Sequence, residues 1–116
     1  PAGDIKARRI EHRPAGVDAN PYLVAATALA GIRHGTKNKI DPGPETTGNG
    51  YTDAQDAPPI PVDWRSAIEA AKASAFLKDA LGEEMHRTFT AIISAEYARV
   101  ARTVSEVDFD LYLHTV

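Results

Sequence analysis

The stretch RRIEHR occupies residues 8–13 near the start of the chain. If residues 7–13 form a β-strand, alternate side chains share a face, so Arg9, Glu11 and Arg13 project from the same side. Two cations and a carboxylate fit poorly in an apolar core, because an unpaired buried charge is costly. The pattern predicts a strand that faces a cleft binding phosphates, a divalent metal ion and a carboxylate. A surface face of alternating ion pairs explains the same spacing equally well.

A helix is predicted shortly after this segment. Asn20 is a favourable N-cap, and Pro21 suits the first helical position, where its missing N–H costs nothing. Apolar residues then recur at helical spacing, and we expect the helix to stop near His34, with Gly35 as its left-handed cap. Residues 38–63 contain several prolines and glycines without sustained periodicity, which predicts an extended loop.

The remainder of the chain has the patterns of short and long helices. Asp63 is placed to cap a helix over residues 64–73, and Gly82 is placed to end a short helical turn before a long amphipathic helix. Ser105 with Asp108 three residues later is typical of a capping box before a last helix. The predicted organisation is a strand and helix over residues 1–37, an extended loop over 38–63 and a helical subdomain over 64–116.

Composition limits the class of protein. With 116 residues, 43% hydrophobic and 25% charged, the chain fits one globular domain or part of one. A net charge of -3 gives no support to a nucleic-acid or anionic-membrane surface, and the absence of cysteine excludes disulfides and thiolate metal sites. The apolar stretch at residues 22–32 is about half the length of a membrane span. We expect a cytoplasmic protein, and Pro1 in place of an initiator Met suggests a fragment.

Several short motifs occur along the chain in a characteristic order. They are RIEHR at 9–13, NPYL at 20–23, GIRHGTKNK at 31–39, DPG at 41–43, GNGY at 48–51 and DFDLY at 108–112. This series spans nearly the whole chain and resembles the C-terminal part of the glutamine synthetase family. EHR at 11–13 and GVDANP at 16–21 are most similar to its bacterial gamma-glutamylpolyamine synthetase branch.

The resemblance implies a fold and an activity. The parent fold would be α+β, and this chain a mainly α fragment with one strand of the catalytic sheet, a helix, a long loop and a C-terminal helical subdomain. The implied activity is ATP-dependent ligation of glutamate to an amine or ammonia through gamma-glutamyl phosphate, with Mg²⁺ or Mn²⁺ as cofactor. The implied full-length protein is a ring-shaped homo-oligomer, with no nucleic-acid or membrane partner.

The resemblance also implies roles for the charged segment. Glu11 matches the family's metal-binding glutamate, Arg9 the arginine that meets the nucleotide phosphates, and Arg13 the arginine that holds the glutamate substrate and its reacting carboxyl group. These roles suit the residue types, because phosphoryl transfer is mainly positioning and charge neutralisation. Arg also grips carboxylates and phosphates bidentately, so Lys would not be equivalent at position 13.

Three interpretations of the function remain open. His12 stands where ammonia-using members commonly carry an apolar residue, which favours an amine such as a polyamine as the acceptor. The alternatives are glutamine synthetase proper, using ammonia, and a non-catalytic helical interaction module. The resemblance implies two or more divalent ions at the site, and one glutamate cannot hold two, so we expect the isolated chain to be inactive. Tyr51 lies in the loop where some bacterial family members carry an adenylylated tyrosine. Its neighbours, Gly50 and Thr52, differ from those of the modified tyrosine, so we infer no regulation there.

Overall fold

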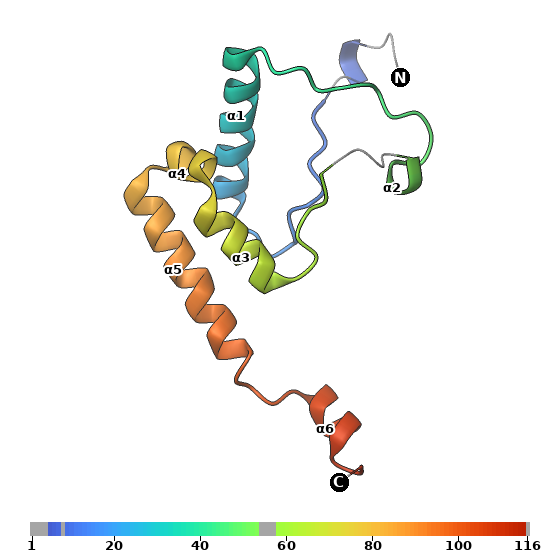
Figure 1. Cartoon of the computed structure of the whole chain (residues 1–116), viewed down its shortest axis with the longest axis vertical. Helices are drawn as coiled ribbons and strands as arrows, with labels where there is room; N and C mark the ends of the chain where they lie inside the picture. The colour runs from blue at the N-terminus through green and yellow to red at the C-terminus, as the bar shows by residue number, and fades with distance from the viewer. Residues whose placement is uncertain (1–4, 8, 54–57, 116) are drawn as a thin grey trace. The chain divides into compact units, whose positions relative to one another are not determined.

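The first long helix begins where its N-cap was predicted. The computed structural model describes residues 5–7, 9–53 and 58–115, and the chain divides into two compact units, Pro1–Ile40 and Asp41–Val116. In the first unit, Asn20 Oδ1 accepts hydrogen bonds from the N–H groups of Tyr22 at 3.0 Å and Leu23 at 3.3 Å. Helix α1 spans Pro21–Asn38, with proline at its first position (Figure 1).

The end of α1 lies one turn beyond the predicted stop. The helix continues through Gly35 to Asn38, and Lys39 takes the left-handed conformation at φ 50°. The N–H groups of Lys39 and Ile40 bond back to the carbonyls of Thr36 and Gly35, respectively. A glycine inside a helix costs only about 1 kcal/mol relative to alanine, so Gly35 does not have to end it.

The strand predicted over residues 7–13 is absent from the part of this segment that the structure describes. Ile5–Ala7 form a short 3₁₀ helix, η1, and residues 9–13 have neither helical nor strand structure; Arg8 lies outside the described residues. A strand depends on a neighbour that completes its backbone hydrogen bonds, and the described residues contain no second strand. Arg and Glu also have low strand propensity, so nothing local replaces the missing neighbour.

The second unit begins with the predicted loop. One short helix, α2, spans Gly50–Asp53 within it. No sequence pattern indicated this helix, because four residues are too few to show a helical periodicity. The predicted division of the chain at 37, 63 and 116 stays a prediction.

Three successive helices follow, with boundaries close to those predicted. They are α3 at Trp64–Ala73, α4 at Ala75–Leu81 and α5 at Glu83–Val100. Asp63 caps α3 by accepting from the Ser66 N–H at 2.9 Å. Gly82 separates α4 from α5 at φ 81°, a conformation that disfavours residues with a Cβ atom.

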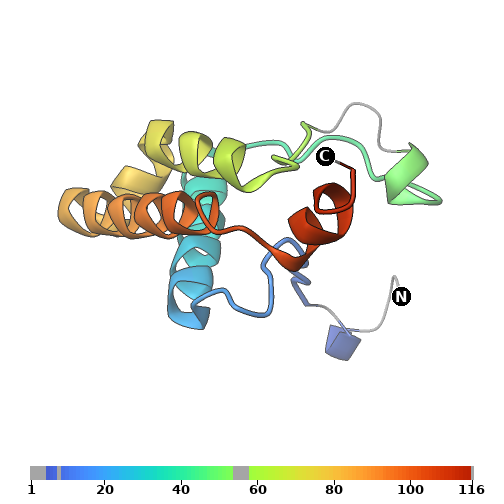
Figure 2. The same cartoon turned by 90° about the horizontal axis from the view of Figure 1, so that it is seen from below.

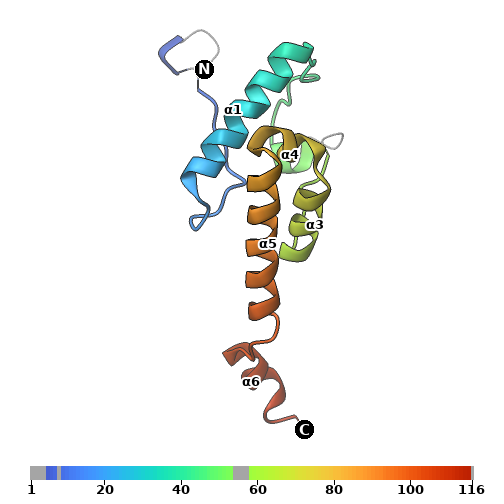
Figure 3. The same ribbon diagram turned by 90° about the vertical axis from the view of Figure 1, so that its left-hand side faces the viewer.

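The core of the second unit lies where α5 packs against α3 and α4. Figures 1, 2 and 3 show α3 and α5 side by side. Ile68 of α3 is 3% exposed, and Thr90 and His86 of α5 are the other buried side chains among the described residues. Because this core is small, each buried side chain accounts for a large share of the contact between these helices.

The last helix, α6, spans Glu106–Tyr112 and starts with the predicted capping box. The Ser105 N–H donates to Asp108 Oδ2 at 2.8 Å, and the Asp108 N–H donates to Ser105 Oγ at 3.3 Å. Phe109, Tyr112 and Leu113 are more than half exposed. Val116 lies outside the described residues. The described chain is thus mainly helical, as predicted.

Candidate functional site

The charged segment, residues 9–13, holds its two arginines around a single carboxylate. The Arg13 Nε–H donates to Glu11 Oε1 at 2.8 Å, and a terminal nitrogen of Arg13 lies 2.5 Å from the same oxygen. A terminal nitrogen of Arg9 lies 3.5 Å from the other oxygen, Oε2. The structure therefore brings together all three residues predicted for the site, although the strand that was expected to align them is not formed.

These ion pairs are exposed to solvent. The side chains of Arg9, Glu11 and Arg13 are 71%, 49% and 78% exposed. Exposed ion pairs stabilise a fold by only about 0 to 1 kcal/mol, so the cluster contributes little to stability. Two guanidinium groups on one carboxylate leave a net positive charge, and most of their N–H donors still face solvent. The cluster is chemically suited to a phosphate or a carboxylate ligand.

Glu11 by itself does not make a metal centre. A carboxylate oxygen is the ligand type that Mg²⁺ and Mn²⁺ prefer. The part of the chain that the structure describes contains no group of three or more His, Asp or Glu side chains able to hold a metal ion. Glu11 therefore supplies at most one ligand, and an ion bound there would need carboxylates from outside the described residues.

His86 is a buried polar residue for which no role was predicted from the sequence. Its side chain is 9% exposed, and its Nε2 lies 2.9 Å from the Ala71 carbonyl oxygen of α3. A carbonyl can only accept, so Nε2 carries the hydrogen. The helical spacing of His86 with Phe89, Thr90 and Ile93 is the sequence pattern that indicates a shared helix face. This hydrogen bond joins α5 to α3 and is structural.

Two aromatic residues make a second contact across the same helix pair. The rings of Trp64 and Tyr97 meet edge to face, with centroids 5.6 Å apart and an interplanar angle of 81°. This geometry is favourable for aromatic pairs and stabilises the packing of α3 on α5. Despite this contact, Trp64 is 43% exposed. The pair has no polar neighbour that indicates chemistry.

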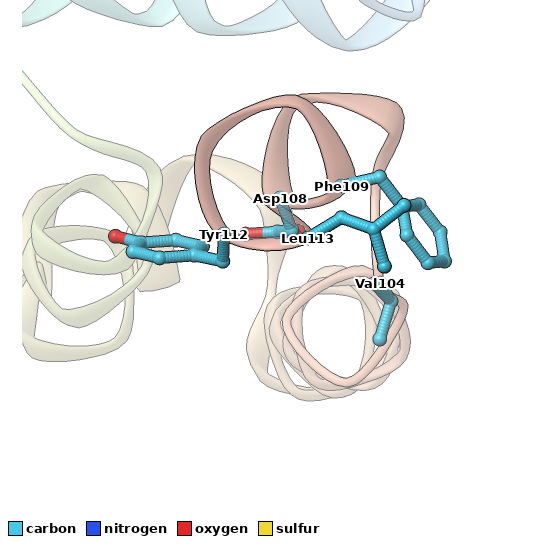
Figure 4. Close-up of a pocket in the computed structure, with 5 residues that line it drawn as sticks. All are labelled: Val104, Asp108, Phe109, Tyr112 and Leu113. Atoms are coloured by element: carbon cyan, nitrogen blue, oxygen red, sulfur yellow. The ribbon is translucent and has the colours of Figure 1, made fainter. Parts of the chain in front are cut away.

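A shallow hollow of about 350 Å³ lies beside α6. It is lined by Val104, Asp108, Phe109, Tyr112 and Leu113. Figure 4 shows Val104, Phe109 and Leu113 on one side and Tyr112 pointing to the other. The Asp108 carboxylate accepts hydrogen bonds from the Ser105 N–H and hydroxyl, both at 2.8 Å, so it is committed to the helix cap. The hollow is apolar and has no group available for acid–base chemistry.

Comparison with known proteins identifies the family to which this segment belongs. The family model for the glutamine synthetase catalytic domain matches residues 1–112. The chain belongs to the glutamine synthetase family. The match includes the charged segment and all of the described helices, so the predicted resemblance is confirmed. No helix in the described part of the chain is long and apolar enough to cross a membrane.

Individual relatives of this glutamine synthetase family chain differ in their named products. It is 34% identical over 113 residues to gamma-glutamylputrescine synthetase of Escherichia coli, covering 97% of this chain and 24% of the relative. It is 32% identical over 119 residues to glutamine synthetase of Methanosarcina mazei, covering 97% and 27%. Gamma-glutamylethanolamide synthetase of Streptomyces coelicolor is 32% identical over 100 residues, covering 86% and 20%. The chain spans about a quarter of the length of these relatives.

Proposed function

We propose that this chain is the C-terminal portion of the catalytic domain of an ATP-dependent ligase. The enzyme would join the gamma-carboxyl group of glutamate to an amine through gamma-glutamyl phosphate. The observation that carries the proposal is the cluster of Arg9, Glu11 and Arg13, which lies inside the segment matched to the catalytic domain. Intact, the protein would be a ring-shaped homo-oligomer in the cytoplasm.

Each residue of the cluster has a proposed task. Arg9 contacts the nucleotide phosphates, and Arg13 holds the glutamate substrate and its reacting carboxyl group. Both tasks need a fixed positive charge with several N–H donors, which a guanidinium provides. In the structure Glu11 holds both guanidinium groups within 3.5 Å of its oxygens, so it would orient them before substrates bind.

Glu11 is also the proposed metal ligand of this segment. A bound Mg²⁺ or Mn²⁺ would supply positive charge close to the phosphoryl oxygens. Because the described residues offer no complete ligand set, the remaining ligands must come from elsewhere in the intact protein. This is also why we propose that the isolated 116-residue chain has no ligase activity.

The proposed acceptor is a polyamine. The support is the similarity to gamma-glutamylputrescine synthetase, which covers 97% of the chain, together with His12 in the middle of the charged segment. A second candidate is ammonia, because the glutamine synthetase of Methanosarcina mazei is 32% identical over 97% of this chain. The identities to the two kinds of relative are nearly equal, so the choice between a polyamine and ammonia requires an assay.

An assay of the intact protein distinguishes the acceptors. ADP release would be measured with ATP, Mg²⁺ and glutamate, comparing putrescine, several monoamines and ammonia. We expect turnover that depends on putrescine and is abolished in Glu11→Ala. Glu45→Ala is the matched control, because Glu45 is an exposed loop carboxylate outside the cluster and should leave turnover unchanged.

The other outcomes of this assay support different functions. Turnover with ammonia alone would identify a glutamine synthetase proper. Absence of turnover with every acceptor would favour a non-catalytic helical interaction module. Turnover that survives Glu11→Ala would contradict the role of Glu11 while leaving the ligase activity established.

A further inference from the structure

The loop that carries α2 contains an asparagine followed by a glycine, at Asn49 and Gly50. Every residue from 48 to 53 is exposed. Gly50 has no Cβ atom, and one built there would meet nothing within 4 Å. Gly50 therefore has no side chain to hinder the approach of its nitrogen to the Asn49 side chain. Asparagine is also a thermally labile residue type.

Local hydrogen bonds hold the Asn49 side chain against the backbone that follows it. Asn49 Oδ1 accepts from the Tyr51 N–H at 3.0 Å, and the Asn49 N–H donates to Asp53 Oδ2 at 2.7 Å. The first bond links the side-chain amide of Asn49 to the backbone two residues further on, across Gly50. It also withdraws electron density from the amide carbonyl, which makes Cγ a better target for a nucleophile.

We propose that Asn49 is a site of spontaneous deamidation. The Gly50 peptide nitrogen, after losing its proton to a base in solution, forms a bond to Asn49 Cγ. The bond from Cγ to Nδ2 then breaks, and ammonia leaves after taking up a proton. The product is a five-membered succinimide. Water opens this ring at either carbonyl to give aspartate or isoaspartate, so the only co-reactant is water.

The two products differ in their effect on α2. Aspartate is as good an N-cap as asparagine, but it places a second carboxylate beside that of Asp53. Isoaspartate inserts an additional carbon into the main chain and displaces the Asn49 carbonyl, which accepts from the N–H groups of Thr52 at 3.0 Å and Asp53 at 2.8 Å. Formation of isoaspartate would therefore unfold α2. This inference does not depend on the proposed ligase activity.

The chain provides its own controls, because it contains only three asparagines. Asn20 precedes Pro21, whose nitrogen has no hydrogen and cannot form the ring. Asn38 precedes Lys39, whose side chain hinders the approach, and its Nδ2 donates to the His34 carbonyl at 2.9 Å. All three sites can be followed in one sample.

The test is to incubate the folded intact protein at mildly alkaline pH and to analyse its peptides by mass spectrometry at intervals. We expect Asn49 to convert faster than Asn38 by on the order of tenfold, a barrier difference of about 1.4 kcal/mol, with no conversion at Asn20. Gly50→Ala should slow the reaction at Asn49 to the rate of Asn38, and its Cβ atom has room in the loop.

Two results would overturn the inference. One is conversion of Asn49 no faster than that of Asn38 in the folded protein. The other is conversion of Asn49 only after unfolding in urea, because this would show that the hydrogen bonds of the cap protect the side chain. Separation of aspartate from isoaspartate by their fragmentation patterns identifies the products.

Discussion

The helices from Trp64 to Tyr112 and the charged segment at residues 9–13 differ in what determines their structure. Each of these helices except α5 begins with a side-chain cap within its own sequence, and the predicted caps at Asp63 and Ser105 are present. The charged segment has no comparable local signal, and its predicted strand is not formed. The ends of a helix are determined by residues close in the sequence, whereas a strand forms only when a neighbouring strand completes its backbone hydrogen bonds. Substitutions in the two regions should therefore have different consequences.

The largest effect on stability is expected at Ile68. This residue is 3% exposed between α3 and α5, so Ile68→Ala should leave a cavity and lower the free energy of unfolding by about 2 to 5 kcal/mol. Denaturant unfolding followed by circular dichroism measures this change. Ile92→Ala is the control, because Ile92 lies on α5 and is 53% exposed. Equal losses in the two variants would contradict the proposed location of the core.

A smaller loss is expected for the hydrogen bond between α5 and α3. His86→Phe keeps an aromatic ring but removes the shorter of the two hydrogen bonds to the Ala71 carbonyl, which then accepts only from the Ser74 N–H at 3.3 Å; the loss should be about 0.5 to 1.5 kcal/mol. His86→Gln retains an N–H donor and should lose less. The same unfolding measurement compares them, and a Gln variant less stable than the Phe variant would show that packing, not the hydrogen bond, matters at this position.

Substitution of Gly82 tests the backbone conformation that connects α4 to α5. Its φ of 81° and ψ of 154° lie in a region that is almost exclusive to glycine, so Gly82→Ala should cost about 1 to 3 kcal/mol of conformational strain. The added methyl group would meet no atom within 4 Å outside the adjacent backbone, so a loss could not be ascribed to a clash with another part of the chain. Gly35→Ala, inside α1, should instead stabilise by up to about 1 kcal/mol. An unchanged stability in Gly82→Ala would contradict the assigned conformation.

The smallest effect is a dependence of helix content on acid pH. Hydrogen bonds from the Ser66 hydroxyl and N–H hold the pKa of Asp63 below its ordinary value of 3.8, and the Ser105 N–H and hydroxyl do the same for the pKa of Asp108. A lowered pKa means that this stabilisation is complete above the ordinary value and is lost as the pH falls below about 3.8. Asp63→Asn should reduce the change in helix content measured by circular dichroism. An identical acid profile in the variant would contradict this.

The sequence allowed the helices to be predicted where caps and periodicity agree. Asn20, Asp63 and Ser105 mark three helix starts, because a cap is a contact between residues two or three positions apart. The end of α1 was missed because Gly35 is tolerated inside a helix. The helical spacing of His86 indicates which face of its helix it occupies, but its hydrogen bond was missed because the acceptor, Ala71, lies on another helix.

The prediction that Arg9, Glu11 and Arg13 lie together is confirmed, whereas the strand predicted for their backbone is not formed. Arg9, Glu11 and Arg13 meet because side chains two positions apart in a non-helical segment can reach one another, with or without a sheet. Their tasks in the proposed ligase depend on groups outside the described residues. The pattern indicated which residues come together, and the family resemblance is the source of their proposed roles.

The most direct test of the account is Glu11→Gln in the intact protein, with turnover and thermal unfolding measured on the same preparation. The substitution preserves shape and removes the charge. We predict that ATP-dependent turnover falls on the order of a hundredfold, while the free energy of unfolding changes by less than about 1 kcal/mol. Unchanged turnover, or a loss of turnover explained by unfolding, would contradict the proposal that the charged segment acts in the chemistry.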